Sequence, residues 1–201
     1  MERSDRRASG ARGTRRWRVA TVALVGVFVL LLTSCFGDGT YRVGYDPGQL
    51  RPGTTYSTAG GQGCHWVEWV GGWLGIVVRG PEHRTTAAER QIHTIGPYTS
   101  AAFSSDGCGI WVRTSAQIPL SPPLADKPAG MWRVPTDMAY GTWTAPGGSG
   151  CYWARLRDFL AGGRSIITSH SGGGRPVVRV GRSVHGFEST GCGTWHWHGT
   201  G

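Results

Sequence analysis

The chain has 201 residues, including 34 glycines, ten tryptophans, five cysteines and a single lysine. The glycines follow no Gly-X-Y period, which excludes collagen, and a charged fraction of 16% with ten tryptophans excludes a charge-driven disordered chain. The net charge of +9 at pH 7 falls to +4 for residues 36–201, because 14 basic and 10 acidic residues lie there. That stretch contains no basic run, so we expect no nucleic-acid partner.

An uncharged apolar run, residues 19–32, follows the arginine-rich N-terminus. As a helix this run would rise about 21 Å, which is less than the ~30 Å thickness of the hydrocarbon core of a membrane. The length therefore predicts the hydrophobic region of a secretory signal peptide rather than a membrane-spanning helix. Whether the run is cleaved or retained as an anchor, the positive-inside rule places residues 36–201 outside the cytoplasm.

The end of this run, Leu32-Thr33-Ser34-Cys35, resembles the lipobox of bacterial lipoproteins. The resemblance implies that residues 1–34 are cleaved as a signal peptide and that Cys35 carries a diacylglycerol with fatty acids such as palmitate. The mature protein would then be anchored in the outer face of the cytoplasmic membrane, with residues 36–39 as a short tether. An uncleaved anchor in which Cys35 has no role is the alternative.

An internal repeat divides the remaining chain into two modules, residues 40–113 and 131–201. The sequence Phe103-x-Ser105-x-Gly107-Cys108-Gly109-x-Trp111 matches Phe187-x-Ser189-x-Gly191-Cys192-Gly193-x-Trp195 at six of nine positions. Residues 114–130 between the modules contain four prolines and predict a semi-extended linker.

Short runs that favour β-strands alternate in each module with glycine- and proline-containing turns. The predicted strands of the first module are residues 40–43, 54–57, 64–69, 75–79, 91–95 and 109–112. Those of the second module are residues 131–134, 141–144, 151–156, 165–168, 176–180 and 193–197. Helix-forming patterns are scarce, so the predicted fold is all-β, with two tandem small modules that are sandwich- or barrel-like.

Four cysteines remain once Cys35 is assigned to the lipobox, and they occupy equivalent positions in the two modules. The most economical pairing is Cys64 with Cys108 and Cys151 with Cys192, since each bond then closes one module. Loops of about 44 and 41 residues would each gain on the order of 4 kcal/mol in a chain-entropy description. A zinc site is the rival interpretation, but the chain has no CxxC pair. The sequence alone leaves the other two pairings open.

The repeated Cys-x-Trp and Phe-x-Ser-x-Gly-Cys-Gly-x-Trp motifs resemble tandem modules in lipoproteins and secreted proteins of high-GC Gram-positive bacteria. The resemblance covers most of residues 40–198, and the excess of arginine over lysine is typical of a GC-rich coding sequence. It implies the architecture and an extracytoplasmic location, and it brings no established activity.

Two pairs of side chains are candidate contact or ligand residues. Trp69 and Trp73 occur in the first module, where the second has aliphatic residues, so we expect an exposed contact surface there, with ordinary core variation as the alternative. His196 and His198 alternate along a predicted strand and would point to one face, as metal ligands can. Two histidines do not complete a site, and we expect neither a metal nor a cofactor.

No catalytic constellation is recognisable, because Cys64 beside His65 is expected to be in a disulfide and no Gly-x-Ser-x-Gly motif occurs. The expected function is a non-catalytic binding or interaction module at the cell envelope. Its partners would be the membrane, through the lipid, and a cell-wall polymer or a membrane or secreted protein. A metal-binding lipoprotein is one alternative. The other is a cell-envelope hydrolase that uses scattered carboxylates, namely Asp46, Glu68, Asp106, Asp137 and Asp158.

Overall fold

The computed structural model describes residues 35–71, 75–114 and 118–200, and Cys35–Gly201 forms one compact unit. The predicted signal peptide, residues 1–34, lies outside the described residues, as does Trp73. The described chain consists of β-strands with one short 3-10 helix, η1, at Gly163–Ser165, so the predicted all-β class is confirmed. None of its helical structure has the length and apolar character needed to cross a membrane.

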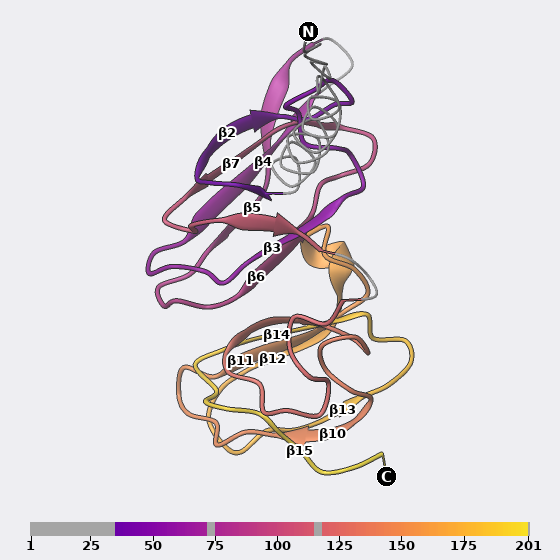
Figure 1. The fold of residues 1–201 in the computed structure, drawn as a ribbon. Helices are drawn as coiled ribbons and strands as arrows, with labels where there is room; N and C mark the ends of the chain where they lie inside the picture. Colours follow the sequence, from indigo (N-terminus) through magenta and orange to yellow (C-terminus); the bar gives the residue numbers. More distant parts are fainter. Residues whose placement is uncertain (1–34, 72–74, 115–117, 201) are drawn as a thin grey trace, which may run out of the picture. The chain divides into compact units, whose positions relative to one another are not determined.

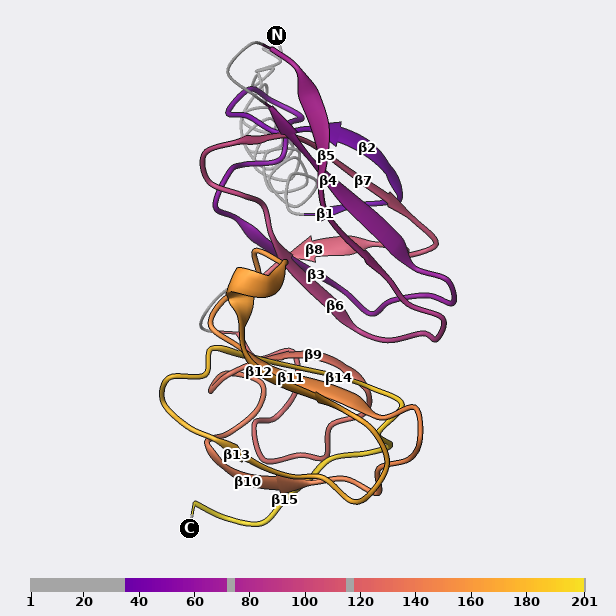
Figure 2. The ribbon, with the colours of Figure 1, turned by 180° about the vertical axis from the view of Figure 1, so that it is seen from behind.

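Two antiparallel sheets form the first half of this unit, residues 35–114 (Figure 1). The strand order is β2-β7-β4-β5 in one sheet and β1-β8-β3-β6 in the other. Figure 2 shows β1 and β8 from behind. The eight strands are β1 (Cys35–Phe36), β2 (Gly39–Arg42), β3 (Thr55–Thr58), β4 (His65–Gly71), β5 (Val77–Arg84), β6 (Gln91–Thr94), β7 (Ser100–Asp106) and β8 (Trp111–Arg113).

The second half, residues 118–200, repeats this order of strands. One sheet has the order β9-β14-β11-β12, and the other has the order β13-β10-β15. Across the described ranges, these sheets stay open and none closes into a barrel. The strands are β9 (Gly130–Arg133), β10 (Gly141–Thr144), β11 (Tyr152–Leu156), β12 (Ile166–Ser171), β13 (Val177–Val180), β14 (Gly186–Thr190) and β15 (His196–Trp197).

The two sheets of each half share one hydrophobic core, and a disulfide lies in each core. The bonds join Cys64 to Cys108 and Cys151 to Cys192, which is the pairing that the sequence favoured. In the first half the bond joins the residue before β4 to the turn after β7, and in the second half it joins the residue before β11 to the turn after β14. Each bond therefore closes its own module.

A buried tryptophan occupies the same position in both cores and has the same kind of partner. The indole N–H of Trp111 donates to the Ser105 hydroxyl at 3.1 Å, and that of Trp195 donates to Ser189 at 3.0 Å. The phenylalanine two residues before each serine meets the tryptophan ring edge-on, with ring centroids 5.3 Å and 4.9 Å apart. The residues that recur in the sequence motif are therefore those that touch one another in the core.

Two central strands, β7 and β14, were missing from the strands predicted by the sequence. Their residues, Ser100–Asp106 and Gly186–Thr190, are mostly small or polar and have low strand propensity. Each strand has a hydrogen-bonded neighbour on both edges, β2 and β4 for the first and β9 and β11 for the second. Pairing on both edges outweighs the low propensity of the residues.

The residues from Cys35 onward pair with the sheet of the first half. Cys35 lies opposite Val112 and Phe36 lies opposite Trp111, because β1 pairs with β8. The Phe36 ring packs against the rings of Trp111 and Tyr41, with centroids 6.2 Å and 4.8 Å away. The folded unit therefore begins at Cys35 itself.

The predicted linker comprises residues 114–130, and its described part packs against the second half. Lys127 is fully buried, and its ammonium group donates to the Ser121 hydroxyl at 2.9 Å and to the Pro122 carbonyl at 2.6 Å. The same group lies 5.3 Å from the centre of the Trp132 ring, a cation–π contact. These contacts make the end of the linker a part of the second half.

The two halves meet along the outer edge of β6, which is the last strand of its sheet. The Met131 N–H donates to the Arg90 carbonyl at 2.9 Å, and the Thr94 N–H donates to the Phe159 carbonyl at 2.8 Å. Gly130, at φ +130°, approaches Arg90 so closely that a Cβ atom would lie 2.9 Å from the Arg90 nitrogen. The second half thus covers a strand edge that would otherwise expose unpaired backbone groups.

Candidate functional site

A cavity of about 440 Å³ lies beside this contact and is lined by residues of both halves. Its apolar wall includes Trp66, Ile92, Met131, Leu156, Phe159 and Ile166. Its ionisable side chains are Glu82, His83, Tyr152, Asp158 and Glu188. An apolar, concave site of this volume with a few polar groups is the usual form of a small-molecule site.

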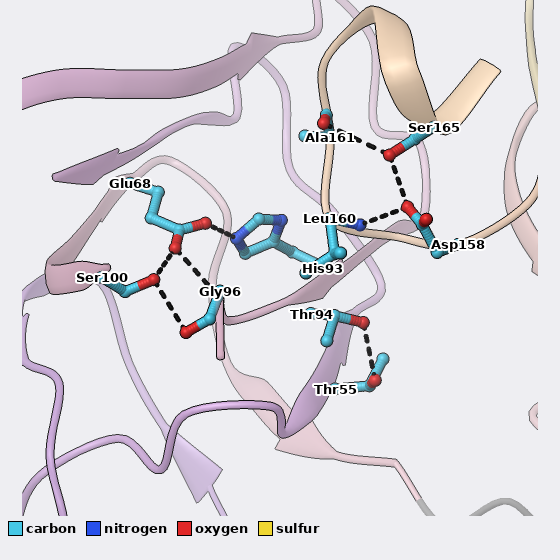
Figure 3. A network of polar contacts seen from close by, with 10 residues as sticks. All are labelled: Thr55, Glu68, His93, Thr94, Gly96, Ser100, Asp158, Leu160, Ala161 and Ser165. Carbon is cyan, nitrogen blue, oxygen red and sulfur yellow. Dashed lines mark hydrogen bonds and ion pairs between the residues drawn. The ribbon is translucent and has the colours of Figure 1, made fainter. Parts of the chain in front are cut away.

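The segment between β11 and η1 forms one wall of the cavity. Asp158 holds its shape, because the carboxylate accepts hydrogen bonds from the Leu160 N–H at 3.1 Å and from the Ser165 hydroxyl (Figure 3). Ala161 has a left-handed backbone conformation with φ 63°, and its side chain packs against the core of the first half. The segment therefore carries the second half across to the first and encloses the cavity on that side.

Glu188, on β14, is the most perturbed ionisable group in the cavity wall. Burial, with a further contribution from the charge of Glu89, raises the pKa of Glu188 to about 7. Its Oε1 atom lies 3.8 Å from Nε2 of His83, but burial lowers the pKa of His83, so the ring is neutral at pH 7. Burial and then the Glu188 charge raise the pKa of Tyr152. Within the described residues no hydrogen bond reaches the Glu188 carboxyl.

A second buried carboxylate, Glu68, does not line the cavity, and both of its oxygens have hydrogen-bond partners. It accepts from the Gly96 N–H at 2.9 Å, from the Ser100 hydroxyl, and lies 2.8 Å from Nε2 of His93 (Figure 3). The serine contacts the carboxylate and not the imidazole, so the three side chains do not form a nucleophile–base pair. The network fixes His93 beneath Trp66, whose ring centroid is 4.2 Å away.

Trp66 connects this network to the cavity. Its ring lies over His93 and, with a centroid distance of 5.9 Å, beside His83. Trp66 is 1% exposed and lines the cavity, and its indole N–H has no acceptor among the described residues. A buried donor without an acceptor is uncommon in folded proteins and costs about 1–3 kcal/mol.

The side chains singled out in the sequence lie elsewhere. Trp69 is half-buried, and its indole N–H donates to the Ser104 hydroxyl at 3.0 Å. His196 lies 2.9 Å from Asp126, whereas His198 lies 2.7 Å from a threonine hydroxyl, so the two histidines have different partners. In the part of the chain that the structure describes, no three His, Cys, Asp or Glu side chains are grouped as metal ligands.

The five carboxylates considered for a hydrolase are dispersed. Asp46 and Asp106 are exposed, and Asp137 is buried in an ion pair with Arg133 at 2.7 Å. Glu68 is buried in its own network, and among the five Asp158 alone lines the cavity. The carboxyl that does face the cavity with a raised pKa belongs to Glu188, which is not among the five.

A signal for Glu188 exists in the repeat. The motif Phe-x-Ser has Ser104 at its variable position in the first copy and Glu188 in the second. An acidic residue in the middle of a strand, where the other copy has a small hydroxyl, marks a difference in environment between copies. His83 and the segment before η1 carry no comparable signal, since their role depends on the contact between halves.

One protein family has a model that matches part of the chain. It is described as the Rv1352-like extracellular domain, and the match covers residues 125–196, which lie in the second half and include Glu188. No curated protein and no solved structure matches the chain. The description supports an extracellular bacterial protein, in agreement with the two disulfides, so the predicted extracytoplasmic location is confirmed.

Glu188 is expected to make the stability of the fold depend on pH. Its pKa is about 7 in the folded protein against an ordinary value of 4.5, so the folded state holds a proton that the unfolded chain releases. The resulting stabilisation is complete below the ordinary value and is lost as the pH rises through the folded value. From pH 5 to pH 8 we expect the free energy of unfolding to fall by about 1–3 kcal/mol more in the wild type than in Glu188→Gln.

Urea denaturation at a series of pH values measures this difference. Asp106→Asn is the matched control, since it also removes one carboxylate but at an exposed position, and it should keep the wild-type pH dependence. Equal pH dependence in the wild type and Glu188→Gln would contradict the burial of an ionisable carboxyl at this site.

Proposed function

We propose that the protein is a lipid-anchored binding protein on the outer face of the cytoplasmic membrane, and that its cavity holds a small ligand. One observation carries the proposal: a largely apolar cavity of about 440 Å³ is lined by residues of both halves and by the carboxyl of Glu188. Protein interiors are normally filled. A ligand would fill the space.

The anchor is supported by the position of Cys35. Its thiol is free and exposed, and it follows the lipobox-like residues directly. Because β1 begins at Cys35, a diacylglycerol on the sulfur would hold the first half at the membrane surface with no intervening spacer. Such a position suits capture of an envelope component more than sampling of the external medium.

A second contact surface is supported by the apolar end of the β4–β5 pair. Ile76, Val77 and Val78 are 60%, 52% and 51% exposed. Val78 lies opposite Val70 on β4, next to Trp69. We propose that this end, together with Trp69 and Trp73, contacts a cell-wall polymer or a neighbouring envelope protein.

Hydrolysis of an envelope component is the second candidate function. A carboxyl with a pKa of about 7, such as Glu188, is suited to act as a general acid near neutral pH. A glycosidase also needs a second, converging carboxylate, and Asp158 is already engaged by Ser165 and the Leu160 N–H. This engagement favours binding over hydrolysis. Turnover of wall glycans by the wild type that is lost in Glu188→Gln would favour hydrolysis over binding.

Filling the cavity should remove the bound ligand. Ile166→Trp places a large side chain in the cavity wall at an expected cost of about 1–3 kcal/mol from overpacking. Small molecules released on denaturation of the membrane-extracted protein are identified by mass spectrometry. We expect one species in near-stoichiometric amount with the wild type and at least tenfold less with Ile166→Trp.

Val177→Trp is the matched control, because it adds the same side chain at a position that is 66% exposed and outside the cavity. It should retain the ligand at the wild-type level. Equal small-molecule content in all three folded proteins would contradict a ligand site in this cavity.

The anchor is tested separately by the intact mass of the membrane-extracted protein. The expected species begins at Cys35 and carries the additional mass of a diacylglycerol. Cys35→Ser should abolish the adduct and release the protein from the membrane, whereas the disulfide cysteines stay unmodified. A mature species that retains residues 1–34, or that lacks lipid, would contradict the anchor.

A further inference from the structure

The cavity wall has an uneven distribution of charge. Three carboxyl groups line it, Glu82, Asp158 and Glu188, and neither lysine nor arginine is found among its lining residues. This contrasts with the excess of basic over acidic residues in residues 36–201. The lining of the cavity is therefore acidic, whereas residues 36–201 as a whole carry a net positive charge.

Two of the three carboxylates already have partners. Glu82 is paired with Arg79 and lies 3.4 Å from His65, and Asp158 accepts bonds from Ser165 and from the backbone. Neither carboxylate therefore needs a positively charged ligand group to balance its charge.

Glu188 differs, because its side chain is 17% exposed and no lysine or arginine among the described residues is paired with it, although Arg84 lines a neighbouring cavity together with it. The ionisable groups coupled to it are neutral or acidic: His83 from β5, Glu89 ahead of β6, and Tyr152 from β11. On the side of β9, its neighbour across the sheet is Met131. A buried carboxylate is stable only when a positive charge or hydrogen-bond donors accompany it.

We propose that the cavity binds an organic cation, with an ammonium group beside Glu188 and an apolar body against the aromatic and aliphatic wall. This inference rests on the proposed function and names the class of ligand for the same cavity. An inorganic cation is disfavoured, because the described residues offer no group of three metal-ligating side chains.

The binding of an ammonium group also fixes the direction of a pH dependence. The cation favours the ionised form of Glu188, so binding lowers the carboxyl's pKa and releases its proton below about pH 7. The fraction of ionised Glu188 rises about tenfold between pH 6 and pH 8, and the affinity for the amine should rise by the same factor.

Three probes of similar size test the sign of the charge: 2-phenylethylamine, 2-phenylethanol and 3-phenylpropanoate. Each is titrated by calorimetry into the detergent-solubilised full-length protein after removal of any bound ligand. We expect the amine to bind at least tenfold more tightly than the other two. Glu188→Gln should weaken amine binding at least tenfold, and the exposed Asp126→Asn should change it less than twofold.

Equal or tighter binding of 3-phenylpropanoate or 2-phenylethanol by the wild type would overturn the inference, as would unchanged amine affinity in Glu188→Gln. The selectivity series on the wild type needs no variant to fold. If the neutral or anionic probe binds and Ile166→Trp abolishes that binding, the cation inference is wrong while the proposed ligand cavity stands. If the amine binds equally well to Ile166→Trp, the ammonium site lies outside this cavity and the inference is also overturned.

Discussion

The outer edge of β6 is the constraint on which the rest of the folded unit depends. An edge strand presents a row of unpaired N–H and C=O groups, and proteins cover such edges to avoid pairing with other chains. Here Arg90 accepts a backbone bond from Met131, and Thr94 donates one to Phe159. Between them the Ile92 N–H lies 3.3 Å from the Met131 sulfur. The second half therefore completes an edge that the first half leaves open.

The covered edge explains why a cavity lies where it does. Backbone hydrogen bonds at both ends of β6 hold the halves together, while each half packs its own hydrophobic core. Each core is built around its own disulfide and its own tryptophan–serine contact, Trp111 with Ser105 and Trp195 with Ser189. The space left between two completed cores is the cavity, and Trp66 and Glu188 line it.

The parts of the two halves that differ are the parts that build the site. The strand order and the aromatic contacts recur in both halves, whereas the segment that contains Asp158 and Ala161 crosses to the first half and Glu188 stands where the first copy has Ser104. The repeated strand order gives both halves the same framework. The residues that build the site lie at positions where one copy differs from the other.

The sequence predicted the frame because the frame depends on local patterns. The positions of Cys64, Cys108, Cys151 and Cys192 in a repeated motif indicated the disulfides, and β-branched runs located strands such as β13. The central strands β7 and β14 were missed, because sheet pairing and not propensity determines them.

The cavity and its lining residues could not be predicted from local sequence patterns. Its walls meet through backbone hydrogen bonds between residues far apart in the chain, such as Thr94 and Phe159, and such contacts leave no periodic pattern. The packing of Phe36 could not be predicted for a similar reason, since it depends on pairing with the distant β8. Trp69 was chosen for its absence from the second copy, but its indole N–H is already bonded to Ser104.

A crystal structure of the protein extracted from its own membrane, without removal of bound molecules, tests the central claim most directly. Ordered ligand density is expected in the cavity, with a nitrogen within hydrogen-bond distance of the Glu188 carboxyl. A cavity that holds only water, or an anionic group beside Glu188, would contradict it.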